Sequence, residues 1–253
     1  MIDLHTHCIF SDGELVPFEL VRRAANKGYR AVAITDHVDA SNIDFVIPRI
    51  VKALRALRGF TPVRAIPGAE LTHVPPGMMV EMVREARDLG AEVVLVHGET
   101  LAEPVEEGTN RAGIEAGADI ISHPGLISDE DVMLAREMGV ALEITARKGH
   151  CLSNGHVARQ ALRHGARLVI NTDSHSPSDQ PAAYSGRDGA KCQHKAVGPR
   201  RLQFVAQPAP AAGGLPAPSR SRAVACRLNL GVWVLYAHGT GRYTVRLLRT
   251  RAG

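Results

Sequence analysis

The sequence predicts an α/β protein in which residues 1–179 form a (β/α)7 barrel. Short β-branched runs alternate with amphipathic segments that end near a glycine, which is the pattern of parallel strands joined by helices. Side chains of the kind that bind metals follow nearly every one of these runs. In a closed barrel all the carboxyl ends of the strands meet at one mouth, whereas an open sheet would keep its edge strands apart. The placement of these side chains therefore favours the barrel.

The expected elements follow one another in regular order. Seven strands are predicted, at residues 2–4, 31–34, 62–66, 92–96, 119–121, 140–144 and 167–170. The first helix begins at Pro17 and stops at Gly28, in agreement with the preference for proline at a helix start and glycine just past its end. A second helix is expected from about Ile47 to Gly59. Four more are expected at about 78–89, 104–116, 129–138 and 154–164.

Composition places the chain among globular proteins. It has 253 residues, 45% of them hydrophobic and only 4% aromatic, which suits an aliphatic core. No leader segment precedes the first strand and no 18-residue apolar span is present, so we expect a soluble, cytoplasmic protein with no membrane partner. The cysteines lack CxxC spacing, and we expect reduced thiols at positions 8, 151, 192 and 226.

Charge divides the chain near residue 180. Residues 1–179 hold 18 Lys and Arg against 25 Asp and Glu, whereas residues 180–253 hold 12 against 1. Such a basic tail could bind nucleic acid, but it is also rich in Ala, Pro and Gly and lacks the helix that should cover the seventh strand. We therefore expect residues 180–253 to be a disordered extension or the product of a reading-frame shift. The apolar run 228–236 could form an isolated strand.

Candidate metal ligands cluster at the predicted strand ends. His5 and His7 lie one residue apart, so both imidazoles share one face of the first strand, and Asp12 can reach them from the following turn. The other candidates are Asp36, His37, Glu70, His97, His123, Glu143, Asp173 and His175. Imidazole and carboxylate ligands suit divalent cations, and this set exceeds what one ion can use, so we expect more than one metal. Neighbouring metals activate water and clamp a phosphoryl group, which predicts hydrolysis.

Ordered motifs follow the predicted strands: His5-Thr-His7 with Ser11-Asp12-Gly13, Thr35-Asp36-His37, Gly68-Ala-Glu70, His97, Ser122-His123-Pro124 and Asn171-Thr-Asp173-Ser-His175. They resemble the successive motifs of the polymerase and histidinol phosphatase (PHP) superfamily. This resemblance covers residues 2–179. It implies a distorted seven-stranded, TIM-like barrel with a trinuclear site of zinc, manganese or iron. It also implies that a metal-activated water, and no further catalytic side chain, attacks the substrate.

The resemblance further implies a ligand set for each of the three metals. His5, His7, Glu70 and Asp173 would hold the first metal, and Glu70 would bridge it to the second, which His97 and His123 complete. The third metal would take Asp12, His37 and His175. Some family members have histidine at the position of Asp12.

Five further residues are open to more than one interpretation. Asp36 and Glu143 could be ligands or hydrogen-bond partners of ligands. Arg147, Lys148 and His150 follow the sixth strand in a glycine-containing loop, where the two cationic side chains could grip a substrate phosphate. A solvated basic loop is the alternative for these three.

The function expected from these features is hydrolysis of a small phosphomonoester, for which the family suggests histidinol phosphate. One alternative is an exonuclease or phosphodiesterase, but the acidic barrel segment shows no basic stripe interleaved with aromatic residues, and we do not expect nucleic acid as a partner. Another alternative is an inactive metal-binding module. The oligomeric state stays open.

Overall fold

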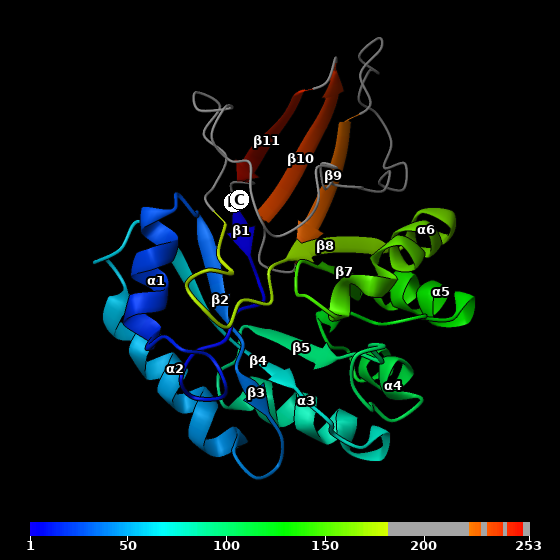
Figure 1. Ribbon diagram of the computed structural model, residues 1–253, viewed down its shortest axis with the longest axis horizontal. Coiled ribbons are helices and arrows are strands. Elements are labelled where there is room, and N and C mark those ends of the chain that lie inside the picture. Colours follow the sequence, from blue (N-terminus) through cyan, green and yellow to red (C-terminus); the bar gives the residue numbers. More distant parts are fainter. Residues whose placement is uncertain (182–222, 229–231, 240–241, 250–253) are drawn as a thin grey trace.

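The computed structural model describes residues 1–181 and, in backbone only, the segments 223–228, 232–239 and 242–249. A parallel sheet curves around the centre of the first segment, and helices lie outside it (Figure 1). Its strands are β1 (Ile2–Asp3), β2 (Ala31–Ile34), β3 (His37–Val38), β4 (Arg64–Leu71), β5 (Val93–His97), β6 (Ile120–Ser122), β7 (Ala141–Thr145) and β8 (Arg167–Asn171). The pairing order is β1-β2-β4-β5-β6-β7-β8, and every pair is parallel.

The first and last strands are joined across the remaining gap. The amide of Leu4 donates to Asn171 Oδ1 at 2.9 Å, and Thr6 forms a parallel bridge with Ser174. Both oxygens of the buried Asp3 accept hydrogen bonds from Thr172, at 3.2 Å from its amide and 2.5 Å from its hydroxyl. The sheet is therefore a nearly closed barrel of seven parallel strands, which confirms the predicted fold class. The short strand β3, which was not predicted, pairs with the carboxyl-terminal end of β4.

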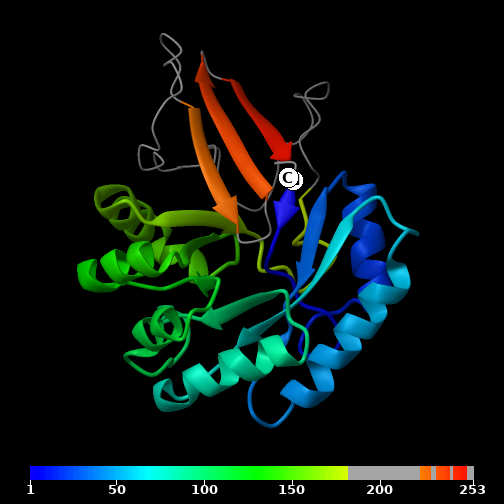
Figure 2. The same ribbon diagram turned by 180° about the vertical axis from the view of Figure 1, so that it is seen from behind.

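Six α-helices cover the outside of the barrel, as Figures 1 and 2 show from opposite sides. They are α1 (Pro17–Asn26), α2 (Ile43–Leu57), α3 (Met79–Asp88), α4 (Thr109–Glu115), α5 (Asp129–Met138) and α6 (Asn154–His164). Two 3-10 helices, η1 (Pro76–Met78) and η2 (His150–Ser153), precede α3 and α6. All six predicted helices are present. The largest differences are an earlier start for α2 and a later start for α4, whose expected first residues form a loop.

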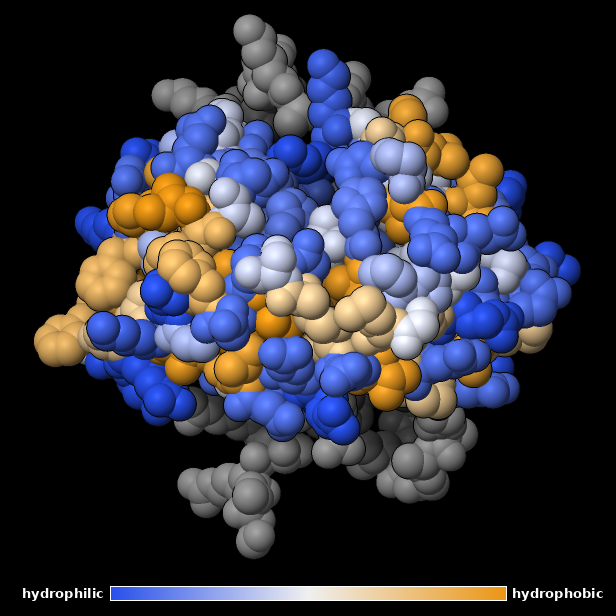
Figure 3. All heavy atoms as spheres, turned by 90° about the horizontal axis from the view of Figure 1, so that it is seen from below, coloured by the Kyte–Doolittle hydropathy of each residue, from blue (hydrophilic) through white to orange (hydrophobic). Residues whose placement is uncertain are grey.

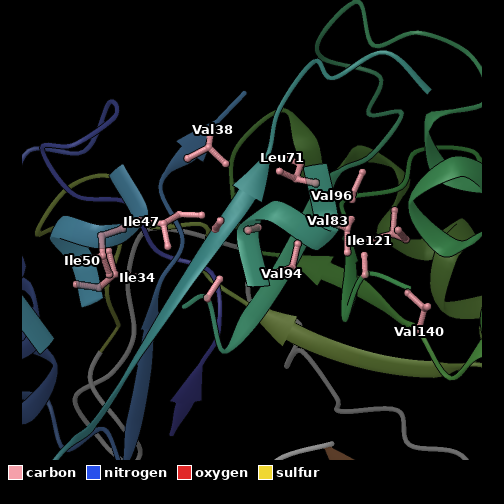
Figure 4. Close-up of a cluster of buried hydrophobic side chains, with 14 of the residues drawn as sticks. Ile34, Val38, Ile47, Ile50, Leu71, Val83, Val94, Val96, Ile121 and Val140 are labelled. Atoms are coloured by element: carbon pink, nitrogen blue, oxygen red, sulfur yellow. The ribbon is translucent and has the colours of Figure 1, made fainter. Parts of the chain in front are cut away.

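The core has two layers because each strand has an outer and an inner face. In the outer layer, Ile34 of β2 lies beside Ile47 and Ile50 of α2, and Val94 of β5 lies near Val83 of α3 (Figure 4). The inner layer is smaller and fills the barrel with residues such as Leu95 and side chains from six other strands or strand ends. The inner layer lies below the mouth, so the side chains at the strand ends have well-packed apolar residues beneath them.

The last barrel strand, β8, is less deeply buried than β5 and β7. Within the described part of the tail, no helix follows β8 before residue 181. The residues of β5 and β7 are fully buried, but the first four residues of β8 are only partly buried. The expectation that the usual covering helix is missing concerns residues beyond 181, so it stays a prediction, as does its effect on stability.

The tail strands form a separate antiparallel sheet in the order β11-β10-β9. They are β9 (Ala223–Leu228), β10 (Val232–Gly239) and β11 (Arg242–Arg249). The apolar run 228–236, expected as an isolated strand, falls largely in β10, which has a partner on each side. The expectation of disorder for 182–222 lies outside the described residues, and the reading-frame hypothesis stays a prediction.

The described surface mixes polar and apolar side chains. On the face in Figure 3, hydrophobic residues form small patches between hydrophilic ones. Among the helices described here, none combines the length and the apolar character needed to span a bilayer.

Candidate metal centre

Every candidate ligand lies at the carboxyl-terminal end of a barrel strand. Glu70 is in β4, and His97 is the last residue of β5. The others follow or end their strands, so the parallel topology brings them to one mouth. Of the nine predicted ligands, only Asp12 is exposed and His37 partly exposed; the remainder are buried or nearly so, and they are His5, His7, Glu70, His97, His123, Asp173 and His175.

The first predicted ligand set forms a compact group. Glu70 Oε2 lies 3.2 Å from His5 Nε2 and 3.6 Å from His7 Nε2. Asp173 Oδ1 lies 3.5 Å and 3.2 Å from the same two nitrogens. Two carboxylate oxygens and two imidazole nitrogens thus face one another, an arrangement that could hold one divalent cation.

The third predicted set also comes together, with His7 beside it. Asp12 lies 3.1 Å from His175 Nε2 and 3.5 Å from His37 Nε2. His7 Nδ1 is 3.8 Å from the same carboxylate, and its ring stacks on His175 at 4.1 Å between centroids. The ligand atoms of these four residues lie within 4.8 Å of one another.

The second predicted set also comes together, and a third imidazole lies beside it. His97 and His123 lie close together, with ring centroids 4.5 Å apart, and His150 completes a group whose ligand atoms lie within 4.8 Å of one another. Glu70 approaches this group only through His123, at 3.6 Å. The carboxylate that approaches both His97 and His150 belongs to Glu103, at 3.3 and 3.4 Å.

Buried atoms without hydrogen-bond partners indicate that the group fits cations. They include His5 Nε2, both ring nitrogens of His7, both carboxylate oxygens of Glu70, and Nδ1 of His97 and His123. Desolvating so many polar atoms without compensation would be costly, and a bound cation would satisfy them.

The ionisation of the group is compatible with this role. Burial, the largest effect, lowers the pKa of His7 to about 4, so its imidazole is neutral at pH 7. Burial alone would raise the pKa of Glu70, but His5 and His37 hold it well below its usual range. Burial alone would lower the pKa of His5, but Glu70, Glu143 and Asp173 raise it well above its usual range. Because a metal-bound imidazole is unprotonated, a cation would displace the proton on His5.

Glu143 contacts the candidate ligands His5 and His123 and does not face the centre of the group. Its Oε1 lies 2.8 Å from His5 Nδ1 and also accepts a hydrogen bond from Asn171 Nδ2 at 2.8 Å. Its Oε2 accepts from the amide of His123 at 3.1 Å. The structure therefore favours the hydrogen-bond-partner interpretation of Glu143, in which it fixes the orientation of His5.

Asp36 likewise faces away from the candidate ligands. Its Oδ1 accepts from the amides of Cys8 and Ser11 and from the Ser11 hydroxyl at 2.7–3.0 Å, and its Oδ2 lies 2.9 Å from Cys8 Sγ. These bonds hold the turn between His7 and Asp12, so Asp36 positions two candidate ligands.

The three predicted phosphate-binding residues occupy different places. Arg147 lies against the group, with its guanidinium 2.7 Å from His175 Nδ1 and a third of its side chain exposed. Lys148 is exposed to solvent. His150 is buried, and its ring packs against that of His123. This position suits a metal ligand better than a residue of a solvated loop.

Backbone strain gathers at the same mouth. Within the described residues, the non-glycine residues with positive φ are His73, His123 and Asp173, at 53°, 30° and 53°. Such conformations persist where surrounding structure imposes them, commonly at functional sites.

Sequence reasoning did not identify Glu103 or Thr100 as site residues, although the Thr100 hydroxyl lies 2.9 Å from His150 Nδ1. Both lie in the loop after β5, which has no periodic pattern and several glutamates. The position of this loop could have pointed to them, since it directly follows the strand that ends in His97 and so lies at the mouth of the barrel.

The comparisons agree with the geometry. Residues 3–146 match the PHP domain family. An uncharacterized protein of Methanocaldococcus jannaschii, MJ1295, is 49% identical over 179 residues, which cover 70% of this chain and 82% of that protein. The DNA polymerase/3'-5' exonuclease PolX of Bacillus subtilis is 27% identical over 69% of this chain, which spans 34% of the polymerase.

Among solved structures, similarity extends to a two-domain protein from Bacteroides vulgatus described as containing a predicted PHP-like metal-dependent phosphoesterase. It is 17% identical, with a TM-score of 0.40, over 70% of this chain and 52% of that one. Since the family match covers more than half of the chain and the M. jannaschii relative is aligned over most of its own length, the protein described here belongs to the PHP domain family.

Proposed function

We propose that this protein is a metal-dependent hydrolase of a small phosphomonoester and that three divalent cations occupy the mouth. The observation that carries this proposal is the convergence of buried imidazoles and carboxylates, many without hydrogen-bond partners, beside the guanidinium of Arg147. Cations of this kind lower the pKa of water and stabilise the charge that develops on a phosphoryl group.

Different residues of the chain would have different roles in the reaction. Glu70 and Asp173 supply the negative charge at the centre of the first group, and Glu143 holds His5 in one orientation. Arg147 is partly exposed at the rim, where its five N–H donors could hold the phosphate oxygens of a substrate in a fixed orientation. The buried walls of the mouth limit access of bulk water, which strengthens each of these electrostatic contacts.

A phosphatase screen after metal loading tests the proposal. The full chain would be loaded with Mn²⁺, Zn²⁺ or Fe²⁺ and assayed against metabolite phosphates, with histidinol phosphate as the family-suggested substrate. His7→Ala and Asp173→Ala should lose most of kcat, while His164→Asn, on the far end of α6, should keep it. If both site variants keep their turnover, the activity lies elsewhere in the chain. If the metal-loaded chain hydrolyses none of the esters, the proposed function is refuted.

A phosphodiester substrate is the second candidate, favoured by the similarity to the 3'-5' exonuclease PolX. Including a single-stranded oligonucleotide in the same screen separates the two candidates. The excess of acidic residues in 1–179 predicts weak binding of such a polyanion by this part of the chain, and salt-sensitive binding there would favour the second candidate. Release of nucleotides at rates above those for monoesters would favour the second candidate.

A further inference from the structure

A cavity lies at the amino-terminal ends of the barrel strands, opposite the candidate metal centre. It has a volume of about 510 Å³ and is lined by the last turns of α2, the start of β4 and the turn before β5. Helix α2 packs beside β4 (Figures 1 and 2). Arg64 begins β4, and Glu70 of the metal centre lies near the other end of this strand. At about 3.3 Å per residue, roughly 20 Å of strand separates the cavity from the mouth.

The floor of this cavity is apolar. Val51 and Leu54 of α2 and Val63 before β4 line it, and each is at most 8% exposed. Gly90 brings the turn before β5 close to this floor, because its φ is +104° and a Cβ there would lie 3.2 Å from Val51. Gly59 follows α2 with a φ of +87°, and a Cβ there would meet nothing within 4 Å. The floor could therefore contact the apolar part of a ligand.

Three guanidinium groups line the same cavity, those of Arg55, Arg58 and Arg64. Arg64 lies 3.4 Å from Glu92, but both side chains are more than 40% exposed, so this pair contributes little to stability. Within the part of the chain that the structure describes, the side chains of Arg55 and Arg58 form no hydrogen bond or ion pair. The cavity thus holds three cationic groups and one carboxylate.

The charge around this cavity is opposite to that of the barrel as a whole. Residues 45–69 contain four arginines, one lysine and no acidic residue, whereas residues 1–179 hold 18 Lys and Arg against 25 Asp and Glu. Thr61 adds a neutral donor to the lining, since its hydroxyl oxygen accepts from the amide of Val63 at 3.3 Å and its proton remains available. Guanidinium groups match the paired oxygens of phosphate and carboxylate groups. The lining therefore suits an anion.

We propose that this cavity binds a small organic anion that has an apolar part and at least two negative charges, as organic phosphates and polycarboxylates do. The apolar part would contact the floor, and the anionic groups would lie against Arg55, Arg58 and Arg64. A volume of about 510 Å³ falls within the range of small-molecule sites, about 300–1,000 Å³. The proposal goes beyond the proposed function, because it requires neither a cation nor any residue of the mouth.

Calorimetric titration of the full chain tests the proposal, with a chelator present so that no cation occupies the mouth. The probes would be ADP, benzene-1,3,5-tricarboxylate and inorganic phosphate. At least one of the two organic anions should bind more tightly than inorganic phosphate, which has no apolar part to cover the floor. The tighter of the two identifies phosphate or carboxylate as the preferred group.

Substitutions in the lining locate the bound anion. Arg55→Gln and Arg58→Gln should each weaken binding by about tenfold, as expected for the loss of one charge-assisted hydrogen bond. Arg22→Gln is the matched control, because it removes an exposed arginine of α1 that does not line the cavity. Arg147→Ala removes the guanidinium at the mouth and should leave the affinity for the organic anion unchanged.

The outcomes separate this cavity from the mouth. If Arg147→Ala weakens binding and the two lining variants do not, the anion binds at the mouth and the proposal is wrong. It is also wrong if no probe binds, or if both lining variants match Arg22→Gln. A single-stranded oligonucleotide that binds through Arg55 and Arg58 more tightly than the organic anions would replace the small ligand with nucleic acid. A chain that hydrolyses no ester but binds the anion here would refute only the proposed function.

Discussion

Replacing Glu143 by glutamine changes one atom of the site and should weaken both metal binding and folding. The carboxylate accepts three hydrogen bonds, from Asn171 Nδ2, from the amide of His123 and from His5 Nδ1 when that nitrogen carries the proton. A glutamine amide has only one oxygen to offer. If that oxygen serves His5 and Asn171, the amide NH2 meets the N–H of His123, and two donors then face each other in a fully buried place.

The magnitude follows from these contacts. An unsatisfied buried donor costs about 1–3 kcal/mol, so the free energy of unfolding of Glu143→Gln should fall by roughly that amount. Loss of a charged outer partner lowers metal affinity by about 10–100-fold, or about 1.4–2.7 kcal/mol. The residue touches His5 but not the centre of the group, so the number of bound cations should stay the same.

Two measurements check this prediction. Urea denaturation of the metal-free chain gives the change in folding free energy, and competition with a chelator gives the affinity for Zn²⁺. Glu115→Gln is the control, because Glu115 is more than half exposed on α4, away from the mouth. Chelator competition that does not distinguish Glu143→Gln from the control would refute the idea that Glu143 orients His5. Complete loss of one cation would instead make Glu143 a ligand.

Three further substitutions test other parts of the molecule. Glu70→Gln should reduce kcat by orders of magnitude with a smaller effect on folding, since a neutral amide cannot replace a carboxylate that faces four imidazoles. Steady-state kinetics with intact circular dichroism would support this. Arg147→Ala should chiefly raise KM for a phosphate ester, and Lys148→Ala, at an exposed position, should change it little; equal effects would count against Arg147 as the phosphate contact. Gly125→Ala should lower the free energy of unfolding by about 2–5 kcal/mol, because the φ of Gly125 is +65° and the new Cβ would overlap the backbone carbonyl of Glu99. Gly117→Ala is the control, since Gly117 has a φ of +75° but open space around it, and it should cost only about 1–2 kcal/mol in the same denaturation assay.

Much of the fold could be predicted from local patterns. The β-then-α alternation depends on side-chain periodicity and on proline and glycine at helix ends, which act over a few residues. The start of α1 at Pro17 is an example. Strand β3 and the loop before α4 were not predicted, because two-residue pairing and irregular backbone leave no periodic trace. The length of β4 was underestimated, since Gly68 lies inside it and glycine usually weakens a strand.

The candidate site divides in the same way. The sequence by itself determined which residue types follow each strand, and parallel topology then required His5, Glu70 and Asp173 to share one mouth. Only the tertiary structure decided what each side chain touches. It turned Glu143 toward His5 and Asp36 toward a turn, and it placed His150 and Glu103 beside His97. These contacts join loops far apart in the chain, and their geometry depends on packing and on backbone conformations that no local pattern encodes.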